Sequence, residues 1–181
     1  MDGILTTIPD LPTSFLVLVL IRSLTSLSYN KPMLLWQSVI ITIYGFISLA
    51  GFVWGLRETK GKQNAFGSAG VFNLIGAFVW GDAIVFGLFW VFVSAATLFL
   101  KDWVLFLLFV SVFWTVRSFA EIQYWISEQF AQKHRNPPEE YRFLHKIFHN
   151  DSVWFVFQIF WQCVIIIGII VSLFLGRRWL R

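Results

Sequence analysis

The chain has 181 residues, of which 57% are hydrophobic and only 13% are charged, and its formal net charge is +4. A soluble domain averages about 25% charged residues, so this chain has too few polar side chains for a surface that faces water all round. The composition excludes an ordinary soluble domain. The basic residues flank apolar stretches, which argues against nucleic-acid binding. The length fits a single domain over residues 1–181.

Four long stretches carry almost no charge and predict membrane-spanning helices, because about 20 apolar residues cross the ~30 Å hydrocarbon layer of a bilayer. Tryptophan side chains, which favour the membrane–water interface, lie near the ends of these stretches. The sequence therefore predicts an all-α, polytopic integral membrane bundle. The four expected spans cover residues 34–56, 78–100, 103–125 and 152–176.

The N-terminal residues 11–29 form a candidate fifth span. Asp10 and Pro12 indicate a helix start, and the residues from Phe15 to Ile21 are strongly apolar. Arg22 and several hydroxyl side chains then dilute the apolar character. A marginal fifth span and an interfacial helix on the membrane surface explain this segment equally well, and both interpretations stay open.

The apolar stretch that contains the second span is too long for one crossing. It runs from Phe66 to Leu100, which would be about 52 Å as a single helix. The surplus, residues 66–79, contains several glycines, which favour a kink or a break. An interfacial helix, a re-entrant segment and a helical extension beyond the bilayer are therefore alternatives. A tilted continuous helix is the preferred interpretation, since glycine is also common in membrane helices.

Small residues and amides predict contacts between helices. Gly51 and Gly55 have the four-residue spacing that lets two helix backbones approach closely, and Gln158 and Gln162 have the same spacing on the last span. For the two glutamines, hydrogen bonds between helices are preferred over ligand binding. Because the chain combines small-residue helix faces with many aromatic residues, we expect it to be a homo-oligomer or a subunit of a membrane complex. Membrane lipid is an expected partner, and nucleic acid is not.

Three charged residues lie in or beside the expected spans. Lys101 and Asp102 alone separate the second and third spans, so these two helices must be antiparallel neighbours. Asp82 and Glu121 are equally far from this turn along the chain, and Arg117 is one helical turn from Glu121. We therefore expect the three side chains to meet. They would form either an ion-paired contact or a vestibule for an ion, a proton or an anionic headgroup.

The loop between the third and fourth spans contains all the histidines. His145 and His149 are four residues apart on an expected interfacial helix over residues 138–150, and His134 precedes that helix. The spacing makes His145 and His149 weak metal candidates, but no His-Glu-x-x-His motif is present, and a basic amphipathic helix explains the segment as well. The sequence predicts no metal and no cofactor, and it assigns no catalytic residue.

The leading functional interpretation is a small channel, a transporter or a transport-complex subunit that uses the vestibule of Asp82, Arg117 and Glu121. The alternative is a membrane-interface enzyme that acts on lipid through the histidine-containing loop. A structural accessory subunit of a membrane complex is the third interpretation. Transport is favoured over catalysis, and the expected location is a membrane crossed several times.

Overall fold

The computed structural model describes residues 33–148 and 152–180, so the candidate fifth span at 11–29 lies outside the described residues. Within these ranges the fold is helical, apart from loops and one isolated β-bridge. Its four long helices are α2 (Leu35–Lys62), α3 (Trp80–Leu100), α4 (Trp103–Gln129) and α6 (Ser152–Trp179). The short ones are η1 (Gly70–Ile75), η2 (Pro138–Glu140) and α5 (Arg142–His145).

Each long helix is long and apolar enough to cross a membrane, which makes the chain compatible with a multi-pass membrane protein. At 1.5 Å per residue, α3 is about 32 Å long, close to the thickness of the hydrocarbon layer. The other three helices are each about 40 Å long and run past the ends expected from the sequence. Their extra turns carry polar residues, such as Lys60 and Lys62 in the last turn of α2.

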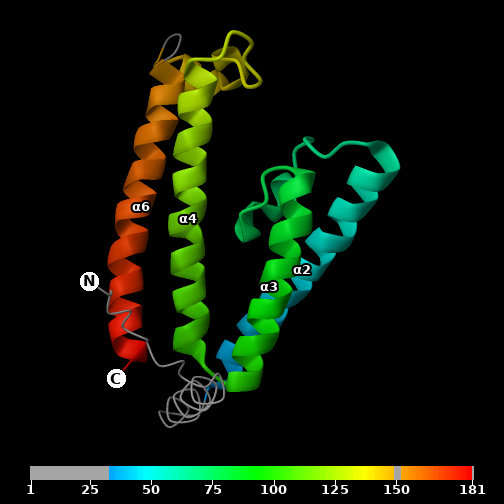
Figure 1. Ribbon diagram of the computed structural model, residues 1–181, viewed down its shortest axis with the longest axis vertical. Coiled ribbons are helices and arrows are strands. Elements are labelled where there is room, and N and C mark those ends of the chain that lie inside the picture. Colours follow the sequence, from blue (N-terminus) through cyan, green and yellow to red (C-terminus); the bar gives the residue numbers. More distant parts are fainter. Residues whose placement is uncertain (1–32, 149–151, 181) are drawn as a thin grey trace, which may run out of the picture.

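The long helices pair into two antiparallel hairpins (Figure 1). Helix α2 packs along α3, and α4 packs along α6. The hairpins meet at the short turn between α3 and α4 and diverge toward their other ends, where the α2–α3 and α4–α6 connections lie (Figure 1). The segment around η1 lies between α3 and α4 in this diverging part (Figure 1).

The turn between α3 and α4 is held by specific polar contacts. Lys101 adopts a left-handed conformation with φ of 52° and ends α3. Asp102 caps α4, because one carboxylate oxygen accepts a hydrogen bond from the Leu105 backbone N–H at 2.9 Å. Its other oxygen accepts one from the Trp179 indole at 2.8 Å. The turn is thereby tied to the end of α6.

Residues 66–79 do not continue α3 as a helix, so the preferred expectation for this stretch is wrong. Helix α3 begins at Trp80, and the preceding residues form a closed loop with η1 at its tip. Backbone hydrogen bonds close the loop at its base, from Ala69 to the Phe78 carbonyl at 2.9 Å and from Gly81 to the Ala65 carbonyl at 2.8 Å. The loop folds back along α3, in the manner of a re-entrant segment (Figure 1).

The buried core lies mainly within the first hairpin and around this loop. Gly51 and Gly55 of α2 are both buried at contacts inside the chain. A Cβ on Gly55 would lie 2.9 Å from the Trp80 carbonyl oxygen, and one on Gly51 would lie 3.0 Å from the Phe72 ring. Close packing of α2 against α3 and the loop therefore depends on these glycines. The core consists of Ile41, Ala69, Phe72, Ile75, Ala77, Ala83, Trp90, Val93 and Phe106.

The connection between α4 and α6 does not contain one continuous helix over 138–150. It contains two short pieces, η2 and α5, which are separated by Tyr141. Residues 149–151 lie outside the described residues. The middle of the connection packs on the α4–α6 hairpin through the Tyr141 ring, whose centroid lies 4.9 Å from that of Phe157 and 5.9 Å from that of Trp125.

Candidate functional site

The three charged side chains singled out in the sequence are in direct contact. Nη2 of Arg117 lies 3.0 Å from Oδ2 of Asp82 and 2.8 Å from Oε1 of Glu121. Asp82 comes from the first turn of α3, whereas Arg117 and Glu121 are one turn apart on α4. The ion pair therefore joins the two hairpins at the level where α3 begins.

Arg117 also holds the loop that precedes α3. Its Nε donates a hydrogen bond to the Gly76 carbonyl oxygen at 3.1 Å. Its guanidinium carbon lies 4.8 Å from the centre of the Phe78 ring and 5.4 Å from the centre of the Phe86 ring. Such cation–π contacts stabilise a guanidinium that has lost part of its water shell. One side chain thus contacts both carboxylates, the loop backbone and two aromatic rings.

Two further side chains bind the neighbouring carbonyl groups of the same loop. The Tyr44 hydroxyl of α2 donates to the Leu74 carbonyl oxygen at 3.1 Å, and the Trp90 indole of α3 donates to the Ile75 carbonyl oxygen at 3.2 Å. Arg117 of α4 binds the next carbonyl, that of Gly76. Three successive carbonyl oxygens of the loop therefore each accept a hydrogen bond from a different helix, α2, α3 or α4. Non-helical backbone is tolerated at membrane depth only where its polar groups are satisfied within the protein.

Tyr44 and Trp90 were not expected at the site from the sequence. Aromatic residues are so frequent in this chain that neither stands out by type. Their roles depend on the course of the loop, which brings the carbonyls of Leu74 and Ile75 beside α2 and α3. A mid-span tyrosine is nevertheless a usable signal, because a phenolic hydroxyl in an apolar helix needs a hydrogen-bond partner.

The charges of the cluster do not balance. Two carboxylates face one guanidinium, so the formal charge is −1 when all three groups are ionised. The Arg117 and Glu121 side chains are only 12% and 10% exposed, whereas the Asp82 side chain is 26% exposed. Asp82 uses Oδ2 for both Arg117 and the Phe78 backbone N–H, which lies 3.4 Å away. No hydrogen bond joins Oδ1 of Asp82 to the residues that the structure describes.

The two glutamines of α6 have different surroundings. The buried Gln158 amide donates to Oε1 of Gln129 at 2.8 Å and to the Trp125 carbonyl oxygen at 3.4 Å, both on α4. Gln162 is exposed, and its side-chain amide makes no hydrogen bond to any residue that the structure describes. The expected interhelical hydrogen bonds are therefore present for Gln158 within the chain.

The histidine loop is built around Glu128, at the end of α4. Its carboxylate accepts hydrogen bonds from the backbone N–H groups of Arg135 and, at 2.8 Å, Asn136. Nδ1 of His134 lies 2.9 Å from the Glu128 carbonyl oxygen, and its ring centroid lies 4.4 Å from that of Trp154. Glu128 and His134 therefore order the connection between α4 and α6.

The histidines do not assemble a metal site within the described part of the chain. His145 lies on α5, and His149 is outside the described residues, so the pair expected from the sequence is not described as a unit. In residues 33–148 and 152–180, no group of three or more histidine, cysteine, aspartate or glutamate side chains could hold a metal ion.

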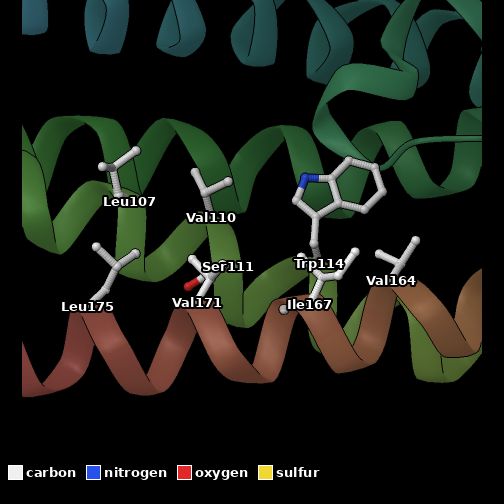
Figure 2. A pocket seen from close by; sticks show the side chains of 9 residues that line it. Leu107, Val110, Ser111, Trp114, Val164, Ile167, Val171 and Leu175 are labelled. Atoms are coloured by element: carbon white, nitrogen blue, oxygen red, sulfur yellow. The ribbon is translucent and has the colours of Figure 1, made fainter.

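An apolar groove of about 350 Å³ runs along the α4–α6 hairpin. Figure 2 shows the Trp114 ring and several aliphatic side chains of both helices along it. The hydroxyl-bearing side chain in its lining is Ser111, whose Oγ accepts a hydrogen bond from the Ser172 hydroxyl at 3.0 Å. Such a lining suits hydrocarbon rather than ions. The lining residues are Leu107, Val110, Ser111, Trp114, Val164, Ile167, Gly168, Val171 and Leu175.

The chemistry available at this site is therefore that of a half-buried ion cluster between two helical hairpins. It lies beside a loop held by three helices and carries one more carboxylate than guanidinium. No protein-family model matches the chain, and no curated protein or solved structure matches it either.

Proposed function

We propose that this chain is an integral membrane protein of the transport class, acting as a channel, a transporter or a transport-complex subunit, and that its charged cluster binds a proton. The membrane assignment is supported by four helices of sufficient length and apolarity, whose surfaces expose large hydrophobic residues such as Phe46, Phe92 and Phe99. Exposed side chains of this kind suit contact with lipid.

The observation that carries the proposal is the charge imbalance of the cluster. Arg117 compensates one carboxylate, and the second stays uncompensated, although the Asp82 and Glu121 side chains are only 26% and 10% exposed. Ionisable groups at such positions are costly and mark ion or proton pathways. Binding of one proton, to Asp82 or to Glu121, brings the formal charge of the cluster to zero.

A proton fits the cluster better than a metal cation does. Hard cations such as Ca²⁺ and Mg²⁺ take six or more oxygen ligands, including waters. Asp82 and Glu121 each keep one oxygen outside their contact with Arg117, and the Gly76 carbonyl already accepts the Arg117 Nε–H. Few protein oxygens therefore remain free, and a divalent cation would leave the cluster with a formal charge of +1, whereas one proton brings it to zero. The partly exposed Asp82 side chain gives that proton access.

The test is proton flux into proteoliposomes that contain a pH-sensitive dye, with a potassium ionophore present to hold the membrane potential. The variants are Asp82→Asn and Glu121→Gln, which keep side-chain shape and leave a carbonyl oxygen for Arg117. Glu139→Gln is the matched control, because Glu139 is an exposed carboxylate of the α4–α6 connection, outside the cluster.

We expect the wild-type protein and Glu139→Gln to carry protons at similar rates, above the rate of empty liposomes. Asp82→Asn and Glu121→Gln should fall to the level of empty liposomes, because either change leaves a neutral ion pair. Circular dichroism and size-exclusion profiles confirm that the variants are folded. Wild-type flux equal to that of empty liposomes, or unchanged flux in Asp82→Asn, contradicts the proposal, and the former result favours an accessory role.

A further inference from the structure

Gln162 is a polar side chain on an apolar, exposed helix face. It lies about 15 Å from the first residue of α6, near the middle of this 28-residue helix. Its amide is exposed and makes no hydrogen bond to the residues that the structure describes. An amide in hydrocarbon without a partner costs free energy, and the glutamine side chain is too short to reach the membrane surface from this depth. The position therefore calls for a partner other than residues 33–148 and 152–180 of the same chain.

Gln162 belongs to a regular stripe along α6. The stripe residues alternate spacings of four and three, which is the a/d pattern of helices that pair along their length. All of its members are exposed. The stripe consists of Phe155, Ile159, Gln162, Ile166, Ile169 and Leu173.

The stripe lies on a different face of α6 from the contacts within the chain. Gln158 and Ser172 point to α4, where they bond with Gln129 and Ser111. Gly168 also faces α4, because a Cβ there would lie 2.3 Å from the Thr115 hydroxyl oxygen. Packing among the described residues thus uses one face of α6 and leaves the face of Gln162 exposed.

We propose that this face of α6 binds the same face of a second copy of the chain, and that the two Gln162 amides hydrogen-bond across the interface. Copies inserted in a membrane with the same topology have parallel α6 helices, so in a two-fold dimer each stripe residue meets its own counterpart. A glutamine amide is self-complementary, since its NH₂ donates and its carbonyl oxygen accepts. The inference requires that α6 spans the bilayer and is independent of proton binding.

A second copy explains the stripe better than lipid does. A neighbouring stripe, about 100° around the helix, is equally exposed and contains Phe160, Cys163, Ile167 and Ile170. It has no group that must form a strong hydrogen bond, so lipid can cover it. A single polar residue within an apolar a/d seam, by contrast, fixes register and partner number in helix pairs.

Disulfide cross-linking in lipid bilayers tests which face of α6 contacts the second copy. Cys163 is the only cysteine, so Cys163→Ser gives a thiol-free background. Ile166→Cys places a thiol on the stripe, and Ile167→Cys is the matched control, because these side chains are 59% and 61% exposed and point about 100° apart. We expect oxidation to give covalent dimers with Ile166→Cys and to leave Ile167→Cys monomeric. Equal cross-linking, preference for Ile167→Cys, or no cross-linking overturns the proposal.

The role of the amide is tested by dimer dissociation on dilution in liposomes, followed by energy transfer between labelled copies. Gln162→Leu removes the hydrogen bonds and should weaken the dimer about tenfold, which corresponds to about 1.4 kcal/mol. Gln162→Asn keeps an amide and should retain most of the affinity. Cys163→Leu, on the neighbouring stripe, should have no effect. A wild-type monomer, or equal affinity of Gln162→Leu, contradicts the proposal.

Discussion

At the scale of single residues, Arg117 is the side chain on which most polar contacts converge. It contacts Asp82, Glu121 and the Gly76 carbonyl at distances of 2.8 to 3.1 Å. A planar guanidinium can serve these acceptors together, because its donors point in several fixed directions, whereas a lysine ammonium is a single point of charge. Arginine is therefore the residue type that can join two hairpins and a loop at one position.

Replacement of Arg117 by alanine should strongly destabilise the fold. The change leaves two carboxylates facing each other without a cation and leaves the Gly76 carbonyl without its donor. Loss of one partner from a buried ion pair costs about 3–5 kcal/mol, and partial exposure of Asp82 places the expected loss near the lower value. Denaturant unfolding in detergent micelles measures it. Arg178→Ala, at an exposed position near the end of α6, should change the free energy of unfolding little, and equal values for both variants would contradict this role of Arg117.

Tyr141 predicts an alkaline loss of stability in the α4–α6 connection. Burial raises the pKa of Tyr141 from 10.0 to about 12. The folded state therefore favours the neutral phenol. Its contribution is present below pH 10 and is lost as the pH rises from about 10 to about 12. Wild type should therefore lose unfolding free energy relative to Tyr141→Phe across this range, because the phenylalanine side chain does not ionise. If the difference in unfolding free energy between the two proteins did not change with pH, Tyr141 would not be the cause of the alkaline loss of stability.

The contacts of the three charges could be predicted from the sequence, and the aromatic donors could not. The short turn at Lys101 and Asp102 fixes which residues of α3 and α4 share a depth, so Asp82 and Glu121 could be placed at one level by counting along the chain. The hydrogen bonds of Tyr44 and Trp90 depend on where an irregular loop runs. Periodicity does not specify such a path.

At the scale of elements, the loop before α3 is the feature that distinguishes this fold from a plain four-helix bundle. Its tip is the 3₁₀ helix η1, and Gly76 ends that helix in a left-handed conformation with φ of 78°. The Phe113 ring of α4 packs where a side chain on Gly76 would lie. The loop is therefore held by steric fit as well as by its three carbonyl contacts.

Gly76→Ala should destabilise the protein by about 2 kcal/mol or more, from left-handed strain and overpacking together. A Cβ at this position would lie 2.6 Å from the Phe113 ring. Gly70→Ala is the matched control within the same loop, because the nearest atom to its Cβ is 3.7 Å away, an ordinary contact. The midpoints of thermal unfolding in detergent micelles compare the stability of Gly76→Ala with that of Gly70→Ala. Equal midpoints for the two variants would mean that the loop does not need glycine at 76.

The long helices could be predicted from the sequence, because the length of an apolar stretch is enough to indicate a membrane-spanning helix. Helices α2, α3, α4 and α6 lie where the uncharged stretches are, because a chain without charges over about 20 residues has few alternatives to a buried or membrane helix. The break before Trp80 could not be chosen with certainty, since glycine both interrupts and packs membrane helices. The 138–150 segment has the composition of an amphipathic helix, but the structure divides it at Tyr141.

At the scale of the whole molecule, two hairpins diverge from the turn between α3 and α4 (Figure 1). The charged cluster and the loop connect them at the level where α3 begins. Long helix pairs pack along each other within each hairpin, whereas the hairpins meet through the charged cluster, aromatic rings and a few aliphatic side chains of α4, such as Leu107 and Val110. Sequence spacing predicted adjacency of α3 and α4 but not their divergence, which depends on side-chain volumes in the loop.

The central claim is that the cluster of Asp82, Arg117 and Glu121 takes up one proton. The most direct measurement is a pH-difference infrared spectrum of the protein in lipid, which reports the carbonyl stretch of a protonated carboxyl group. We predict that, above about pH 5, where exposed carboxyl groups are ionised, such a band appears as the pH is lowered in wild type and in Glu139→Gln. It should be absent in both Asp82→Asn and Glu121→Gln, since each leaves one carboxylate paired with one guanidinium. Identical spectra for wild type and these two variants would contradict the account.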